Sequence, residues 1–74
     1  MTTKVLEIIN GIRVAKGLMP IGSINSETRL REDLSFTSFD LAELTVKIED
    51  EFDIDIFEDG LVNTVGEILA KLEK

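Results

Sequence analysis

The feature that most constrains this chain is an amphipathic segment that runs from Ser38 to Phe52. Its apolar residues recur at the spacing of one face of an α-helix, and its opposite face is acidic. Thr37 and Asp40 stand at the spacing of a capping box, with Asp in a place usually taken by Glu or Gln. We therefore predict a helix over 38–52 with Thr37 as its N-cap. Its apolar stripe consists of Leu41, Leu44, Thr45, Ile48 and Phe52.

Two further segments have the same helical periodicity. The first covers residues 3–16 and is followed by Gly17, a residue type that commonly ends helices. The second covers residues 64–72 and begins with a capping box made by Thr64 and Glu67. We predict a helix in each segment.

The stretch between the first two helices predicts a long loop. Pro20 and Gly22 interrupt any helical pattern there, and residues 26–33 are compatible with one short helical turn. Apolar residues spaced along the loop can anchor it across the core. These anchors are Leu18, Ile21, Ile24, Leu30 and Leu34.

The segment from Phe52 to Gly60 alternates briefly between apolar and polar residues, as a strand does. It is too short for a stable strand and has no partner in the chain, so we predict a turn and a short helix near residues 57–62. The prediction is an all-α single domain, 1–74: a small four-helix bundle of three main helices and one short helix. At 74 residues, such a domain must bury most of its apolar side chains.

The composition argues against several classes of function. A net charge of −7 repels nucleic acid and anionic lipid, so neither a nucleic-acid nor a membrane partner is expected. The chain has no cysteine and no histidine, which counts against an enzyme. Its first residues are too polar for a secretory signal, and no apolar run reaches membrane length. We expect a cytoplasmic monomer.

The acidic run at residues 49–60 invites comparison with a calcium-binding loop. If Asp55 takes the first loop position, Gly60 falls at the required sixth position. Phe57 and Gly66 then fall at positions three and twelve, where oxygen ligands are needed. We therefore predict no dedicated metal site.

Two features of the second helix have both an ordinary and a functional interpretation. A serine at a helix start, such as Ser38, is usually capping chemistry, and spacing alone does not distinguish it from an attachment point. The polar face is either a solvated surface or a docking strip for basic partners. The docking candidates are Asp40, Glu43, Lys47, Asp50 and Glu51.

The stretch DLSFTSFDLAELTVKIEDEFDIDI at residues 33–56 resembles the acyl carrier protein family. The signature of that family is an Asp-Leu-Gly stretch, then Asp-Ser-Leu, then an acidic amphipathic helix that ends in Glu-Glu-Phe. The matching residues are Asp33, Leu34, Ser38, Asp40, Glu43, Leu44, Glu49, Glu51, Phe52 and Ile56, with Thr64 and Val65 at the start of the last helix.

The resemblance implies a non-catalytic carrier. Ser38, flanked by Thr37 and Phe39, would bear 4′-phosphopantetheine from coenzyme A, and the cargo would be held on its thiol as a thioester. The implied partners are a phosphopantetheinyl transferase and acyl-loading and acyl-processing enzymes whose basic patches dock on the acidic second helix. An acyl chain could be lined by residues that serve equally well as ordinary core. These pocket candidates are Leu44, Thr45, Ile48, Ile56 and Val62.

Several positions depart from the family pattern. Thr37 stands where Asp is usual, Phe39 where Leu is usual, and Ser35 replaces Gly. The segment 57–64 is about two residues shorter than in fatty-acid carriers, and Phe57 stands where Pro is common. These differences indicate a specialised carrier, and Phe39 resembles some D-alanyl and peptidyl carriers.

Two alternatives therefore stay open. One is a carrier of D-alanyl, peptidyl or polyketide units in place of fatty acyl groups. The other is a carrier-like interaction module in which Ser38 stays unmodified.

Overall fold

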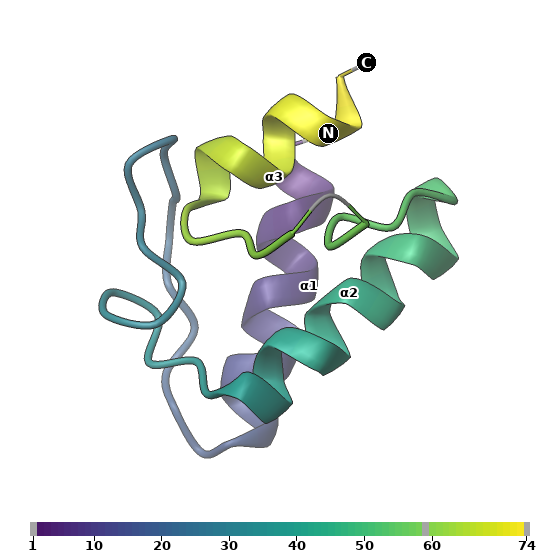
Figure 1. Cartoon of the computed structure of the whole chain (residues 1–74). Helices are drawn as coiled ribbons and strands as arrows, with labels where there is room; N and C mark the ends of the chain where they lie inside the picture. The colour runs from purple at the N-terminus through teal and green to yellow at the C-terminus, as the bar shows by residue number, and fades with distance from the viewer. Residues whose placement is uncertain (1, 59, 74) are drawn as a thin grey trace.

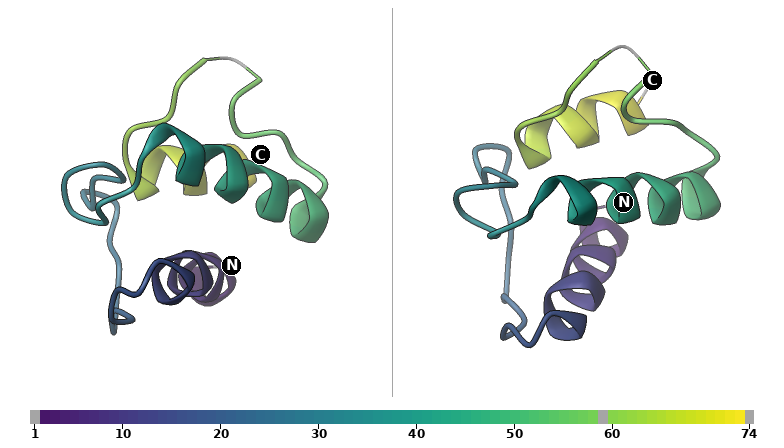
Figure 2. Two further views of the ribbon diagram at one scale, coloured as in Figure 1. Left: turned by 90° about the horizontal axis from the view of Figure 1, so that it is seen from below. Right: turned by 60° about the horizontal axis from the view of Figure 1, so that its bottom comes forward.

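The computed structural model describes residues 2–58 and 60–73. These contain three helices, α1 (Thr2–Ala15), α2 (Ser38–Phe52) and α3 (Val65–Leu72) (Figure 1). Helices α1 and α2 pack against each other, and the long α1–α2 loop runs along one side of the molecule in every view (Figures 1 and 2). The all-α prediction is confirmed. No helix in the described part of the chain is long and apolar enough to cross a membrane.

Side chains at the helix starts explain why the predicted bounds lie close to the observed ones. The Thr37 hydroxyl accepts from the Asp40 N–H, and the Asp40 carboxylate accepts from the Thr37 N–H. Thr64 and Glu67 make the same reciprocal pair at α3. Each pair satisfies N–H groups that a helix start leaves without intrahelical partners. At its other end α2 stops at Asp53, which has a left-handed backbone with φ of 59°.

The short fourth helix predicted near residues 57–62 is not found in the described part of the chain, and Asp59 lies outside that part. A turn takes its place, because the Asp55 carboxylate accepts from the Phe57 N–H at 2.9 Å. Gly60 has φ of 131°, which a right-handed helix cannot include. The local hydrogen bonding of Asp55 and the backbone of Gly60 therefore replace helix with turn.

Four of the five apolar residues expected to anchor the long loop lie in the core or pack against it, and the fifth, Leu18, is partly buried. Leu30 and Leu34 are fully buried, and Ile21 and Ile24 are partly buried against the same cluster. The predicted short turn is also present, since the Asp33 N–H donates to the Arg29 carbonyl at 3.0 Å. The core combines all three helices with both connections. Its members are Val5, Ile9, Ile12, Leu30, Leu34, Phe36, Leu41, Leu44, Ile48, Ile56, Val62, Val65, Ile68 and Leu72.

The loop is also joined to the start of α3 through backbone hydrogen bonds. The first two N–H groups of that helix donate to loop carbonyls: Val65 to Thr28 at 2.9 Å, and Gly66 to Ser26 at 3.0 Å. A Cβ atom at Gly66 would lie 2.6 Å from the Ser26 carbonyl oxygen. Only glycine lets the two backbones approach this closely.

We expect Gly66→Ala to lower the free energy of unfolding by about 1–3 kcal/mol, because the new methyl group forces the loop away from α3. Urea denaturation followed by circular dichroism measures the change. Gly11→Ala is the matched control, since a Cβ there meets nothing within 4 Å. The free energy of unfolding of that control should rise by about 0.5–1 kcal/mol, because alanine has a higher helix propensity than glycine. A Gly66→Ala chain as stable as Gly11→Ala would contradict the close approach.

Candidate functional site

Ser38 is the first residue of α2 and is exposed to solvent. Its Oγ accepts a hydrogen bond from Arg31 Nη2 at 2.9 Å. The backbone N–H groups at this helix end carry partial positive charge, which favours an anion nearby. The site therefore presents an accessible hydroxyl in locally positive surroundings, although the chain as a whole is acidic.

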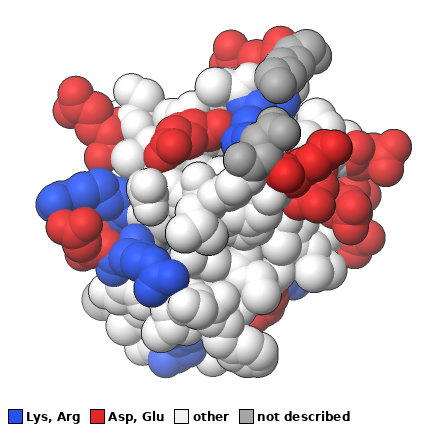
Figure 3. Space-filling view, in the orientation of Figure 1, with Lys and Arg blue, Asp and Glu red and all other residues white. Residues whose placement is uncertain are grey.

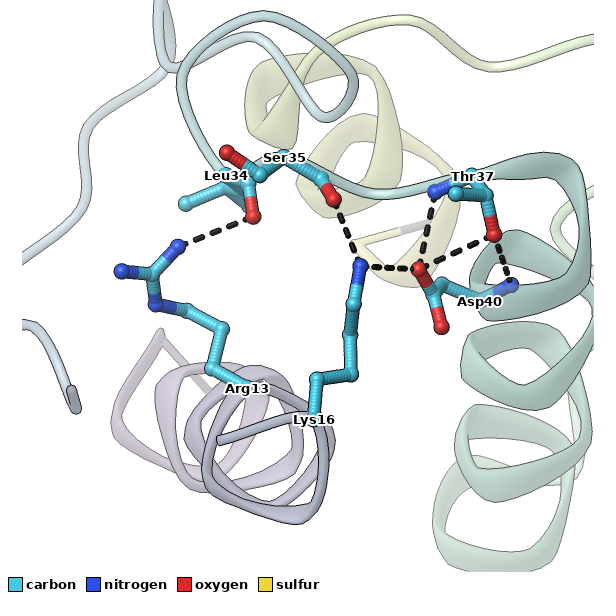
Figure 4. A network of polar contacts seen from close by, with 6 residues as sticks. All are labelled: Arg13, Lys16, Leu34, Ser35, Thr37 and Asp40. Atoms are coloured by element: carbon cyan, nitrogen blue, oxygen red, sulfur yellow. Dashed lines mark hydrogen bonds and ion pairs between the residues drawn. The ribbon is translucent and has the colours of Figure 1, made fainter. Parts of the chain in front are cut away.

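The first turn of α2 is fixed to the C-terminal end of α1 by Lys16 and Asp40 (Figure 4). Asp40 Oδ2 accepts from Lys16 Nζ at 2.5 Å and from the Thr37 N–H at 2.8 Å. The same ammonium donates to the Ser35 carbonyl at 2.7 Å. Asp40 is only 7% exposed, so its carboxylate interacts with groups of the protein rather than with solvent.

Two more contacts, from Arg13 and Lys16, hold the segment that precedes Ser38. Arg13 Nη1 donates to the Leu34 carbonyl at 2.9 Å (Figure 4), and the Lys16 ammonium lies 5.9 Å from the centre of the buried Phe36 ring. Ser35, between these residues, adopts a left-handed backbone with φ of 61°. A non-glycine residue in that conformation is strained, so the contacts on either side of it keep the approach to Ser38 in one conformation.

The pKa of Asp40 is lowered by these contacts. Burial on its own would raise it, but the hydrogen bonds from Lys16 and from the backbone and hydroxyl of Thr37 outweigh burial. The carboxylate is consequently ionised at neutral pH, which is the state that both the capping box and the ion pair require.

The structure separates the predicted docking residues into two sets. Glu43, Lys47, Asp50 and Glu51 are exposed along α2, with Lys47 Nζ 3.9 Å from a Glu43 oxygen. Asp40 is buried instead, so its carboxylate is not part of the exposed face of α2. Acidic residues gather over the C-terminal end of α2 and the segment after it, whereas basic residues lie mainly on the side of the α1–α2 loop (Figure 3).

Four of the five predicted acyl-pocket residues lie in the core. Leu44, Ile48, Ile56 and Val62 are between 0% and 2% exposed. Thr45 is half-buried, and its hydroxyl lies 3.4 Å from an Asp55 carboxylate oxygen. None of the five lines the surface depression beside Ser38.

A shallow depression of about 210 Å³ opens beside Ser38. Two of its walls, Leu41 and Ala42, follow Ser38 by three and four positions, which places them on the same helix face. The sequence alone indicates that these two residues share a helix face with Ser38. It does not indicate which loop residues complete the depression. The lining residues are Arg31, Ser38, Leu41, Ala42, Phe57 and Leu61. Phe39 is not among them and is 76% exposed.

A second depression, of about 340 Å³, lies between α1 and α2 and is bordered by charged residues of both helices. Lys4 and Glu7 stand on its α1 side, and Lys47, Asp50 and Glu51 on its α2 side. Within the described residues, no group of three or more His, Cys, Asp or Glu side chains could hold a metal ion.

The chain matches a known protein family and known relatives. The family described as "Phosphopantetheine attachment site" matches residues 5–72. An "Acyl carrier protein" of Phytoplasma australiense is 36% identical over 72 residues, which covers 95% of this chain and 95% of the relative. The matched span includes Ser38, all of α2 and all of α3.

We expect Lys16→Met and Asp40→Asn to be coupled energetically. In a double-mutant cycle of urea denaturation near pH 7, the coupling should be roughly 1–3 kcal/mol, because loss of the Lys16 ammonium leaves the poorly exposed Asp40 carboxylate without its cation. The control cycle is Lys47→Met with Glu43→Gln, an exposed pair expected to give about 0.2–0.5 kcal/mol. Equal coupling in both cycles would contradict the role of Lys16.

The same variants give a pH dependence of known sign. The pKa of Asp40 in the folded state lies below its usual 3.8. Its contribution to the free energy of unfolding is therefore present above pH 3.8 and is lost as pH falls through the folded-state pKa. The stability difference between wild type and Asp40→Asn should therefore be constant near neutrality and shrink below about pH 4. A difference that grows on acidification would show that the carboxylate is not held ionised.

Proposed function

The chain belongs to the acyl carrier protein family, and on that premise we propose that it holds an acyl group or a related intermediate as a thioester on a 4′-phosphopantetheine arm attached to Ser38. The observation that carries the assignment to Ser38 is its exposed hydroxyl at the first position of a firmly anchored helix. The chain has no cysteine, so the thiol of the arm is the sulfur that bears the cargo.

The residues around Ser38 fit such an arm. Attachment forms a bond between Ser38 Oγ and phosphorus, breaks the P–O bond to the 3′,5′-ADP half of coenzyme A, and releases the hydroxyl proton to a base outside this chain. The Ser38 hydroxyl is open to a transferase, and Arg31 offers a cation beside the anionic linkage. The walls formed by Leu41 and Ala42 offer an apolar surface next to the base of the arm.

Partner enzymes dock, on this proposal, on the exposed acidic residues of α2. Glu43, Asp50 and Glu51 are open to solvent, and the chain has a net charge of −7. Such a field speeds the approach of a basic surface and orients it before contact. The partners are a phosphopantetheinyl transferase and the enzymes that load and process the cargo.

The shape of the surface supports a short cargo. The depression beside Ser38 is shallow, and the core beneath it is closed by side chains such as Leu44 and Ile48. A second candidate is a D-alanyl, peptidyl or polyketide-type carrier, which is favoured by the exposed Phe39 ring next to Ser38. The mass of the thioester trapped on the chain distinguishes these cargoes.

We expect the purified chain to gain one phosphopantetheine unit when it is incubated with coenzyme A, magnesium and a broad-specificity transferase. Ser38→Ala should gain none, because it lacks the accepting oxygen, whereas the exposed Ser23→Ala should be modified as fully as wild type. Intact-mass measurement decides the outcome. An unmodified wild type, or an equal gain in Ser38→Ala, contradicts the proposal and favours a bare interaction module.

We expect the combined change Glu43→Lys and Asp50→Lys to lower kcat/KM of the transferase for this chain by on the order of tenfold at low salt, because the steering field is reversed. The loss should shrink as salt screens the charges. Glu27→Lys with Glu73→Lys is the control, since it makes the same change of net charge at exposed residues outside α2. If both double variants lose activity equally, net charge rather than docking on α2 governs the encounter.

A further inference from the structure

Arg31 is the cation that stands at Ser38. Its guanidinium donates to Ser38 Oγ at 2.9 Å across seven positions of sequence. Its acidic neighbours Glu32 and Asp33 pair with Arg29 instead, at 2.7 and 3.2 Å. In the described part of the chain, Arg31 therefore has a hydroxyl as its partner and no carboxylate.

The backbone beside Arg31 is firmly held even though its side chain reaches the surface. Leu30 is fully buried, and its N–H donates to the Asn63 carbonyl at 2.9 Å. The turn that contains both residues is closed by the hydrogen bond from Asp33 to Arg29. The guanidinium thus extends from an anchored turn toward Ser38, and pairing there orders only one side chain.

A hydroxyl is a modest partner for a guanidinium, whereas a phosphodiester is a strong one. Charge-assisted hydrogen bonds from arginine to phosphate oxygens are shorter and stronger than neutral ones, and the planar fork of donors matches two oxygens at once. When Ser38 carries the phosphodiester, phosphorus is bonded to Oγ and the charged oxygens lie two bonds beyond Oγ. A guanidinium that already contacts Oγ reaches them without rearrangement of the loop.

We propose that Arg31 is a positioning residue for the arm, an inference that rests on the attachment to Ser38 proposed above. Its guanidinium pairs with the phosphodiester and holds the base of the arm at the rim of the depression that Arg31 and Ser38 share. The pairing limits the directions in which the arm leaves α2 and favours those that pass over the apolar walls.

The test compares the modified forms of wild type, Arg31→Gln, Arg31→Lys and Lys4→Gln, each confirmed by intact mass. Lys4→Gln is the matched control, because it removes one cation from the first turn of α1, outside both the site and the docking residues of α2. Phosphorus NMR reports on the phosphodiester, and nitrogen–proton spectra of the arginine Nε–H groups report on Arg31. Thermal unfolding followed by circular dichroism checks that the variants fold.

In wild type we expect the Arg31 Nε–H signal to shift when the arm is attached. The phosphorus signal should move and narrow in Arg31→Gln and recover in part in Arg31→Lys. It should stay at the wild-type position in Lys4→Gln. If all four chains carry the arm but have the same phosphorus signal, the pairing is wrong while the proposed function stands. If no chain accepts the arm, the proposed function itself is wrong, and the pairing fails with it.

Discussion

The contact between Lys16 and Asp40 is the interaction on which the rest of the site depends. Asp40 is the third residue of α2, and its carboxylate is shared between the capping box and the ammonium that follows α1. Successive residues of an α-helix are rotated by about 100°, so Ser38 and Asp40 stand about 200° apart around the axis. Fixing Asp40 toward α1 therefore turns Ser38 toward solvent. An ionised carboxylate this poorly exposed is tolerated because its donors are in place.

This geometry gives the two ends of α2 different chemistry. Its N-terminal end combines an exposed hydroxyl with Arg31 and an apolar depression. Its C-terminal end, together with the segment that follows, carries much of the acidic surface visible in Figure 3. On the proposed function, the attached group is handed over while the partner holds another part of the surface. The single helix α2 then keeps Ser38 at a fixed distance from the exposed acidic residues near its C-terminal end.

The parts of the fold that local chemistry dictates could be predicted from the sequence. Both capping boxes, the extent of α2 and the apolar anchors of the loop follow from short spacings. The short fourth helix could not be predicted correctly, because the Asp55 side chain and the Gly60 backbone favour a turn. The inward position of Asp40 escaped the sequence reasoning as well, since its partner Lys16 lies 24 positions earlier. Arg31 lies next to Ser38 because of the conformation of the α1–α2 loop, and no periodic pattern in the sequence predicts that conformation.

The most direct measurement is fragment mass spectrometry of the chain isolated from the cells that make it. If the anchored start of α2 exists to display Ser38, a single phosphopantetheine group will be found on the peptide that contains Ser38 and on no other serine or threonine. A native chain in which Ser38 is bare, or in which the group is attached elsewhere, would contradict the account.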